Sequence, residues 1–423
     1  MKVIQINSMC KSGSVSQIAI QIQKILLEQG DDSSIAYGRG TSVEGVTSHK
    51  FSSEIGVRLH VVLNRVTDKH GLYSKFSTKK LIKYLRVEKP DIVHLHCVHG
   101  YYVNYELLFA YFKEIGLPVV WTFHDCWAIT GHCAFFDLVG CDKWKTGCYN
   151  CPSKKEYPAS FFLDSSDKNY EKKIDAFTST PRMIIVTPSI WLKNVVAESF
   201  LSKYETVVIN NGIDCQVFKP IEDKDIIEGI YKKYLNDYDK KKIILGVANI
   251  WSRRKGLEDF VKLSQILSQE FQIILVGLTK RQIKQLPENI IGVERTNSAN
   301  ELAALYSGAY CFLNLTYDDN YPTTNIEALS CGTPVITYDT GGSGEMIEKE
   351  YIVKKGDLHS VAKLIKNNDF KRINVGDKFD AKYCFQKYLE LYRRIHDFPW
   401  EDNLSAIHSK VVRPQNESKG HSI

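Results

Sequence analysis

Short apolar runs alternate with amphipathic segments along most of the chain, and this alternation restricts the fold more than any other feature. In the first half, the apolar runs cover residues 2–6, 34–37, 92–96, 119–124 and 183–187. In the second half, they cover residues 242–248, 272–277, 310–315 and 334–338. Short continuous apolar runs are typical of strands that are buried on both faces, as in parallel sheets connected by helices. The pattern therefore predicts an α/β fold with parallel sheets.

The same pattern predicts two domains. A chain of 423 residues exceeds what one hydrophobic core usually spans. A charged, less periodic region over 204–242 separates the halves, so we place the domains at 1–205 and 206–380. The segment 381–400 contains a helix over 382–395 that closes the fold, and the polar tail 401–423 is predicted to be disordered. The remaining predicted helices lie over 15–29, 78–87, 105–115, 257–268, 300–306 and 324–330.

Composition favours a cytoplasmic protein. Hydrophobic residues make up 43% of the chain and charged residues 25%, as in ordinary globular proteins. No apolar run approaches the ~20 residues of a membrane span, and Met1 leads directly into a predicted strand rather than a signal peptide. The eleven cysteines are therefore expected to be reduced thiols. The net charge of +6 would suit polyanionic or membrane-surface partners without demonstrating either.

The stretch 318–345 combines an anion site with carboxylates. Asp319 and Glu327 flank the start of a predicted helix, whose free backbone N–H groups suit a phosphate. Carboxylates do not bind phosphate, so these two are expected to accept hydrogen bonds from sugar or ribose hydroxyls. Gly341 and Gly342 follow the next strand at its carboxyl end, where open α/β sheets bind ligands. Phosphate together with a polyol indicates a sugar nucleotide.

Three further segments follow predicted strands. A basic turn contains Lys255 and either Arg254 or Arg253, which could neutralise a diphosphate. His124 ends a buried strand and could donate a hydrogen bond to a sugar hydroxyl. The loop after the first strand has a single glycine, Gly13, where a dinucleotide fingerprint needs three, so an NAD site is disfavoured. Gly13 would allow close backbone approach, and Ser14 is predicted to cap the following helix.

Cysteine spacing suggests a structural metal site. Four thiols fall within nineteen residues, and the last pair forms a Cys-x2-Cys step, which is a common half-site for tetrahedral zinc. Cys126 and His132 could substitute as ligands. The predicted zinc ligands are Cys133, Cys141, Cys148 and Cys151. A second group, His94, His96 and His99, could form a metal trio, but His94 and His96 share one face of a strand and would rather line a cleft floor.

At this point the sequence resembles the retaining glycosyltransferases of family 4. The resemblance rests on the D-x7-E step from Asp319 to Glu327, on ALSCGTPVI and GGSGE, and on TFHDCWAITGHCAFFD around His124. The family's usual motif is E-x7-E, and Asp319 stands where its first glutamate is expected. The resemblance implies the GT-B fold, with two Rossmann-like domains whose parallel sheets face each other across a cleft.

The resemblance also implies residue roles. The catalytic residues would be His124, beside the donor sugar, together with Asp319 and Glu327, and Gly13 and Ser14 would lie on the acceptor side. The donor-binding set would be Arg254, Lys255, Asp319, Asn320, Tyr321, Thr324 and Glu327. The donor would be a UDP- or GDP-sugar, and no cofactor would be required for catalysis.

Further motifs resemble bacterial enzymes of capsule, exopolysaccharide and O-antigen assembly, among them GCDKWKTGCYNCP, TPSIWL and NNGIDCQVFKP. The acceptor would then be a saccharide or a saccharide linked to undecaprenyl diphosphate. The basic segment 75–89, with Leu81, Ile82 and Leu85 as an apolar stripe, is predicted to contact an anionic membrane surface. No nucleic-acid-binding module is evident.

Two other functions fit the same fold. A sugar-nucleotide 2-epimerase shares the GT-B architecture but transfers nothing to an acceptor. A non-catalytic assembly scaffold is the second alternative.

Overall fold

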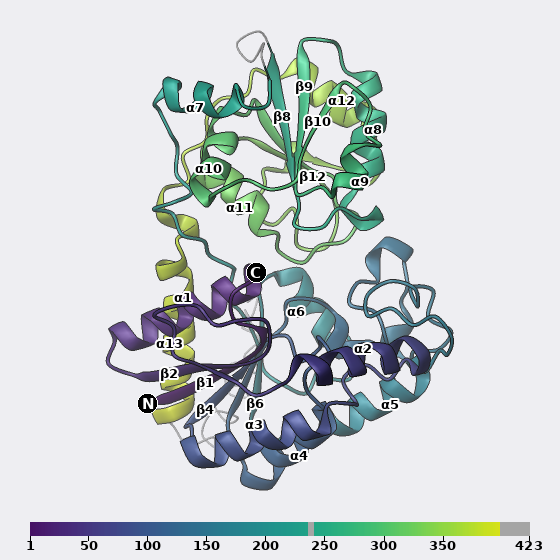
Figure 1. The fold of residues 1–423 in the computed structure, drawn as a ribbon, viewed down its shortest axis with the longest axis vertical. Helices are drawn as coiled ribbons and strands as arrows, with labels where there is room; N and C mark the ends of the chain where they lie inside the picture. The colour runs from purple at the N-terminus through teal and green to yellow at the C-terminus, as the bar shows by residue number, and fades with distance from the viewer. Residues whose placement is uncertain (236–240, 398–423) are drawn as a thin grey trace, which may run out of the picture.

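The computed structural model describes residues 1–235 and 241–397, which form two parallel sheets flanked by helices (Figure 1). The first sheet has seven strands in the order β3-β2-β1-β4-β5-β6-β7, and the second has six in the order β10-β9-β8-β11-β12-β13. All strand pairs in the described residues are parallel, because each connection crosses over through a helix or a long loop. The predicted α/β class is confirmed.

The strands match the apolar runs of the sequence, with short edge strands added. In the first sheet they are β1 (Lys2–Met9), β2 (Asp32–Arg39), β3 (Ser48–Lys50), β4 (Ile92–Leu95), β5 (Val119–Thr122), β6 (Met183–Thr187) and β7 (Thr206–Val208). In the second sheet they are β8 (Lys242–Val247), β9 (Phe271–Val276), β10 (Ile290–Val293), β11 (Cys311–Asn314), β12 (Val335–Tyr338) and β13 (Ile352–Val353).

Helices cover both faces of each sheet. Those of the N-terminal domain are α1 (Ser14–Glu28), α2 (Glu54–Thr67), α3 (Lys75–Glu88), α4 (Tyr105–Ile115), α5 (Ser166–Phe177) and α6 (Ile190–Ala197). Those of the C-terminal domain are α7 (Lys224–Tyr231), α8 (Leu257–Ile266), α9 (Lys280–Ile283), α10 (Ala299–Gly308), α11 (Thr323–Ser330) and α12 (Leu358–Asn367). Four buried clusters of apolar side chains result, one on each face of each sheet.

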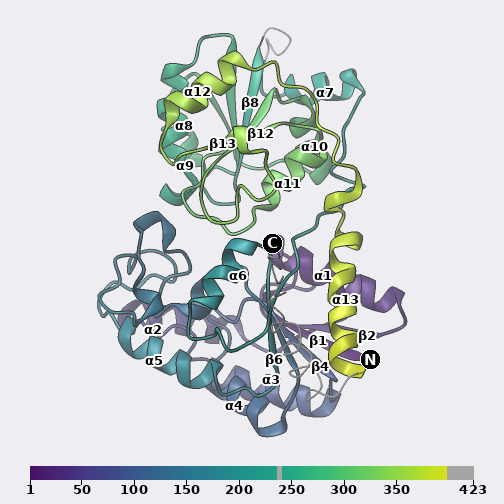
Figure 2. The same cartoon turned by 180° about the vertical axis from the view of Figure 1, so that it is seen from behind.

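The last helix, α13 (Ala381–Asp397), leaves the C-terminal domain and packs on the N-terminal one, beside α1 (Figure 2). Its Tyr388 hydroxyl lies 2.9 Å from the Thr122 hydroxyl, and its Tyr392 hydroxyl lies 2.6 Å from Nδ1 of His94. Side chains of α13 also belong to the same apolar cluster as Ile22 and Leu26 of α1. The helix is therefore part of the N-terminal core.

Two expectations need correction. The region between the domains contains the regular element α7, which packs on α10 and donates a hydrogen bond from the Tyr231 hydroxyl to the carbonyl of Leu305 at 2.5 Å. The apolar stripe predicted to meet a membrane instead faces the core, because Leu81 and Leu85 are fully buried and Ile82 is half-buried. The predicted tail 401–423 lies outside the described residues.

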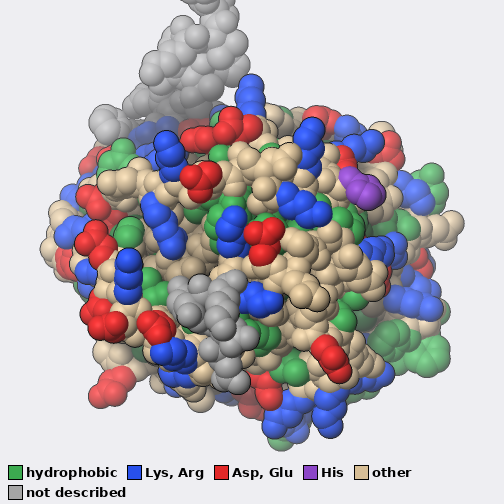
Figure 3. Space-filling view, turned by 90° about the horizontal axis from the view of Figure 1, so that it is seen from above, with side chains coloured by type: hydrophobic (Ala, Val, Ile, Leu, Met, Phe, Trp, Pro, Cys, Tyr) green, Lys and Arg blue, Asp and Glu red, His purple; other side chains and the backbone are tan. Residues whose placement is uncertain are grey.

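None of the helices within 1–235 and 241–397 combines the length and apolarity needed to cross a membrane. Viewed from the end of the C-terminal domain, basic and acidic side chains are interspersed (Figure 3).

Candidate functional site

The basic turn after β8 contacts the acidic loop before α11. Nζ of Lys255 lies 2.5 Å from Oδ2 of Asp319, and Nη1 of Arg254 lies 3.9 Å from the same oxygen. Burial opposes ionisation of Asp319, yet Lys255 and Arg254 hold its pKa below the usual value. Burial also lowers the pKa of Lys255, with Asp319 opposing that shift. The structure thus brings these predicted donor-binding residues together.

Arg254 is fixed by groups from both domains. Its Nη1 donates a 2.5 Å hydrogen bond to the carbonyl of Asp318, and its guanidinium lies 3.9 Å from the centre of the Phe135 ring. Phe135 belongs to the cysteine-rich loop of the N-terminal domain, 126–152. Arg253 has neither contact, so Arg254 is the arginine that the structure places beside Lys255.

The N-terminus of α11 is open. Its N-cap is Pro322, which provides no capping side chain, so the amides of the first turn keep their anion-binding capacity. Glu327 lies in the second turn and accepts a 3.0 Å hydrogen bond from the Tyr306 hydroxyl. Burial raises the pKa of Glu327 to about 7, with Tyr306 and Thr323 opposing the shift. Thr324 is half-buried, whereas Tyr321 is buried.

Gly341 and Gly342 are required because backbone approaches them closely. A Cβ atom on Gly341 would overlap the carbonyl oxygen of Asp319, and one on Gly342 would overlap the carbonyl oxygen of Asn320 and the side chain of Ser189. Glycine at both positions therefore lets the backbone of the acidic loop pack closely against residues 341 and 342.

His124 lies directly across from this loop. Nδ2 of Asn320 donates a 3.5 Å hydrogen bond to the carbonyl of Phe123, and its Oδ1 accepts a 2.5 Å bond from the Ser189 hydroxyl. Nε2 of His124 lies 3.1 Å from Nδ1 of His96. Burial lowers the pKa of His124 to about 4, so the ring is neutral at pH 7. A neutral imidazole held by a second histidine can orient a substrate hydroxyl.

The Gly13 loop differs from the prediction in one detail. Gly13 itself is the N-cap of α1, with φ of 91°, and Ser14 is the first helical residue rather than the cap. A Cβ atom at Gly13 would meet no other atom within 4 Å, so its left-handed conformation, not crowding, selects glycine there. Ser16 instead secures the turn by donating to the carbonyls of Met9 and Ser12.

Beside His124 lies a dyad that the sequence does not predict. Nε2 of His99 is 2.8 Å from Oδ2 of Asp125, and its Nδ1 is 2.9 Å from the Tyr157 hydroxyl. Burial opposes the charge on His99, but Asp125 holds its pKa well above the usual value. His96, His99, His124 and Asp125 line one pocket. The His-Asp step at 124–125 is the available signal in the sequence, but nothing local links it to His99, which the sequence offers only as a possible member of a histidine trio.

That trio does not form a metal site. The ring centres of His94 and His96 lie 4.1 Å apart with the rings tilted, whereas His99 pairs with Asp125. Nε2 of His94 bonds the Thr122 hydroxyl at 2.7 Å, and Nε2 of His96 bonds Oε1 of Gln5 at 3.0 Å.

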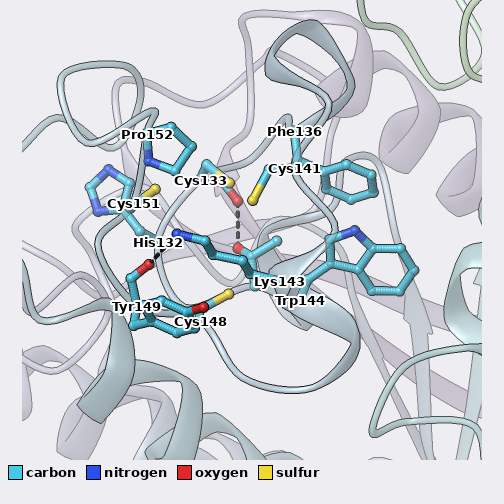
Figure 4. Close-up of a pocket in the computed structure, with 11 residues that line it drawn as sticks. His132, Cys133, Phe136, Cys141, Lys143, Trp144, Cys148, Tyr149, Cys151 and Pro152 are labelled. Atoms are coloured by element: carbon cyan, nitrogen blue, oxygen red, sulfur yellow. Dashed lines mark hydrogen bonds between the residues drawn. The ribbon is translucent and has the colours of Figure 1, made fainter.

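The four predicted zinc ligands surround one small pocket beneath the cysteine-rich loop, together with His132 (Figure 4). Nδ1 of His132 bonds the Asp68 carboxylate, while its Nε2 is buried without a hydrogen-bond partner. The donor types suit zinc. Within the described ranges, however, no three Cys, His, Asp or Glu side chains stand close enough together to hold a metal as placed. Zinc therefore stays a prediction.

The cysteine-rich loop also contacts the donor side. Oδ2 of Asp318 accepts hydrogen bonds from the amides of Asp137 at 2.6 Å and Leu138 at 3.2 Å. The Asp137 carboxylate is in turn 2.6 Å from Nζ of Lys355 and 2.7 Å from the Thr340 hydroxyl. Burial, reinforced by Asp137, raises the pKa of Asp318 to about 7. No local sequence signal marks these residues, because their partners lie far away in the chain.

A third contact joins the domains at α6. The Glu345 carboxylate accepts hydrogen bonds from the amides of Ile190 at 2.9 Å and Trp191 at 2.7 Å, at the N-terminus of that helix. A carboxylate of one domain thus occupies an anion-binding helix end of the other.

Comparison with known proteins agrees with this architecture. Residues 22–217 match the family model Glycosyltransferase Family 4, and residues 241–367 match the model Glycosyl transferases group 1. A protein of Escherichia coli described as the colanic acid biosynthesis glycosyl transferase WcaC is 24% identical over 367 residues, covering 82% of this chain and 86% of that protein. An N-acetylgalactosaminyltransferase of Campylobacter jejuni, described as acting on N,N'-diacetylbacillosaminyl-diphospho-undecaprenol, is 24% identical over 206 residues, covering 45% of this chain and 54% of its own.

Solved structures show the same fold. A glycosyltransferase from Rickettsia africae superposes with a TM-score of 0.63 at 19% identity, covering 93% of this chain and 98% of its own. HepE of Anabaena, solved in complex with UDP, superposes with a TM-score of 0.64 at 14% identity, covering 93% and 99%.

Two Rossmann-like domains with a basic turn, an open helix end and a histidine across the cleft define a glycosyltransferase of the GT-B fold. The two family matches together span most of the chain, and the protein belongs to glycosyltransferase family 4.

Proposed function

We propose that the protein is a retaining glycosyltransferase that moves a sugar from a nucleoside-diphosphate sugar to a saccharide or lipid-linked saccharide. One observation supports this most directly. Asn320 reaches from the loop beside Lys255 and Asp319 to the backbone of Phe123, so the donor loop and His124 flank the same space. A substrate between them would meet cations on one side and a neutral hydrogen-bonding ring on the other.

The donor would bind mainly to the C-terminal domain. Lys255 and Arg254 would offset the diphosphate charge, together with the first-turn amides of α11. Asp319 would then exchange its ion pair for hydrogen bonds to hydroxyls of the sugar, and Glu327 would accept bonds from the ribose. UDP- and GDP-sugars both fit this description.

Retention fits the protonation states of the two histidines. A His124 ring with a pKa of about 4 is a weak base at pH 7, and His99 is kept protonated by Asp125. Neither histidine suits the deprotonation of an attacking hydroxyl. In the proposed reaction the leaving phosphate takes that proton on the same face of the sugar, and the configuration at the anomeric carbon is retained.

The site residues also account for the charge that develops on the leaving diphosphate, so the proposal includes no catalytic divalent cation. Transfer is expected to need no added magnesium or manganese. Activity that disappears with EDTA and returns with magnesium would contradict this part of the proposal.

The proposed biological setting is assembly of a bacterial cell-surface polysaccharide. It rests on the descriptions of the E. coli and C. jejuni relatives, which name colanic acid biosynthesis and an undecaprenol-linked acceptor. The proposed location is the cytoplasm, where nucleotide sugars would be available.

We further propose a structural zinc in the cysteine-rich loop. The buried, unpartnered Nε2 of His132 supports it, because an Nδ1 bond to a carboxylate is a common arrangement for metal-binding histidines. The surrounding thiols would have to turn inward to complete the ligand set.

The decisive experiment has two stages. Thermal-shift screening with UDP-, GDP- and ADP-sugars identifies the donor, and NMR of the product then gives its anomeric configuration. An inverted product would exclude retention. Conversion of the donor to its 2-epimer without an acceptor would identify an epimerase, and no affinity for any nucleoside diphosphate would favour a scaffold.

A further inference from the structure

An exposed apolar stripe follows α2 of the N-terminal domain. Ile55, Leu59, Val62 and Val66 are between 43% and 81% exposed. Their spacing of four, three and four residues places them on one face of the helix. The opposite face is buried through Val57, His60 and Asn64. The buried face is thus largely polar, whereas the apolar stripe of this helix faces solvent.

A neighbouring loop enlarges the stripe. Phe161, Phe162 and Leu163 are between 54% and 71% exposed. The loop is fastened to the end of α2, because the amide of Phe161 donates to the carbonyl of Arg65 at 2.8 Å and the amide of Leu163 donates to that of Val66 at 3.1 Å. We refer to these seven residues, 55, 59, 62, 66 and 161–163, as the α2 patch. Contiguous exposed apolar side chains of this number mark an interaction surface.

Basic side chains border the α2 patch. Arg58, Arg65 and Lys69 are exposed along α2 and just after it, and the Arg65 guanidinium lies 5.8 Å from the centre of the Phe161 ring. The acidic residue at the start of the helix, Glu54, is paired with Lys50 at 2.8 Å, which offsets its charge.

A second basic helix packs beside α2. The α3 helix adjoins α2, since the Ser52 and Ser77 hydroxyls are 3.1 Å apart and Nδ1 of His60 is 2.7 Å from the Ser74 hydroxyl (Figure 1). Its exposed side chains include Lys75, Phe76, Lys79, Lys80 and Lys83. An apolar stripe with cationic borders is the composition of a surface that inserts into the headgroup region of a bilayer.

We propose that the α2 patch docks on an anionic lipid bilayer, with its apolar side chains below the phosphates and its cations at their level. The charges favour lipid over a second copy of the chain, because a symmetric pairing through this face would bring the two basic borders together. Attraction to anionic lipid has the opposite sign and adds to the burial of the apolar side chains.

The patch also adjoins the His99 pocket. The buried side of α2 contacts Tyr101 through His60, with ring centres 5.6 Å apart, and the Tyr101 ring lies 6.1 Å from that of Tyr157, which bonds His99. A docked bilayer would therefore lie beside the acceptor side of the cleft. This orientation, unlike the docking itself, rests on the proposed function.

Vesicle flotation without any donor tests the docking. The probes are vesicles of phosphatidylglycerol and phosphatidylethanolamine, compared with vesicles of phosphatidylcholine alone. The variant Leu59→Ser/Phe162→Ser is expected to bind the anionic vesicles at least tenfold more weakly than wild type. The matched control is Ile226→Ser, on the exposed face of α7 in the other domain, and it should bind like wild type. Arg58→Glu/Lys69→Glu should lose binding to the anionic vesicles with the apolar stripe intact.

UDP binding measured on the same samples separates folding and donor binding from docking, and all these variants should retain it. Equal flotation of wild type and Leu59→Ser/Phe162→Ser would overturn the proposal. So would a stable dimer in solution that these substitutions disperse while wild type ignores the vesicles, because the patch would then belong to a second copy.

Discussion

Replacing Lys255 by methionine, alone and together with Asp319→Asn, separates the contribution of the Lys255–Asp319 pair to stability from the contribution of Lys255 to UDP binding. The substitution leaves a carboxylate that is only 16% exposed with Arg254 at 3.9 Å as its nearest remaining cation. Removing one partner of a buried pair costs about 3–5 kcal/mol, and we expect about 3 here because Arg254 remains. For a domain of this size, that corresponds to a fall in Tm of roughly 6–12 °C.

The double variant Lys255→Met/Asp319→Asn removes the stranded charge. We expect it to recover most of the lost Tm but not the affinity for UDP. A hydrogen bond from Lys255 to phosphate is expected to contribute about 1.5–3 kcal/mol to binding. Its loss predicts a Kd for UDP that is roughly 10- to 100-fold higher. Differential scanning fluorimetry and isothermal titration calorimetry measure the two effects. A single variant that kept wild-type Tm and UDP affinity would refute the reasoning, because neither role could then be assigned to this pair.

Three further outcomes are expected. The affinity of wild type for UDP, measured by calorimetric titration, should rise up to about tenfold between pH 6 and pH 8, because Glu327, with a pKa of about 7, accepts hydrogen bonds from hydroxyls better once ionised. In Glu327→Gln the UDP affinity should not depend on pH over this range. The same pH dependence in this variant as in wild type would argue against that carboxylate. Gly342→Ala should reduce transfer at least 100-fold in a product assay, because its Cβ would overlap Asn320 and part the domains, whereas Gly229→Ala, which meets no atom within 4 Å, should be as active as wild type. Elemental analysis should find about one equivalent of zinc per chain, reduced in a Cys148→Ser variant, and well under one equivalent in wild type would exclude the structural site.

The buried strands could be predicted from sequence because their environment is uniform. Segments such as β4 and β5 are covered on both faces, so most of their side chains are apolar and the run is easy to detect. The edge strands β3 and β7 are only partly buried and carry no such run. Helix α2 is hard to detect because its apolar stripe faces solvent while polar residues such as His60 and Asn64 are buried, and α5 is hard to detect because its sequence is mostly polar.

Part of the candidate site was equally accessible. Local sequence motifs indicate the chemical roles of Lys255, Asp319 and Glu327. The structure brings Lys255 and Asp319 into contact. Asp318 was overlooked because its partners, the amides of Asp137 and Leu138, are about 180 residues away and belong to backbone rather than to side chains. Contacts of this kind depend on how the domains meet, which no local pattern encodes. The cap at Gly13 was misassigned by one residue, since serine is the commoner helix cap.

The path of α13 has a consequence for biosynthesis. One face of the N-terminal sheet is completed by Phe385, Tyr388 and Tyr392 of α13, at the far end of the described chain. Domains usually fold in order as they leave the ribosome. Here the N-terminal domain cannot complete its folding, and that face of its sheet stays exposed, until the C-terminal domain and α13 have been translated. An isolated fragment ending after β7 would therefore expose an apolar surface and aggregate, unless α13 were added as a separate peptide.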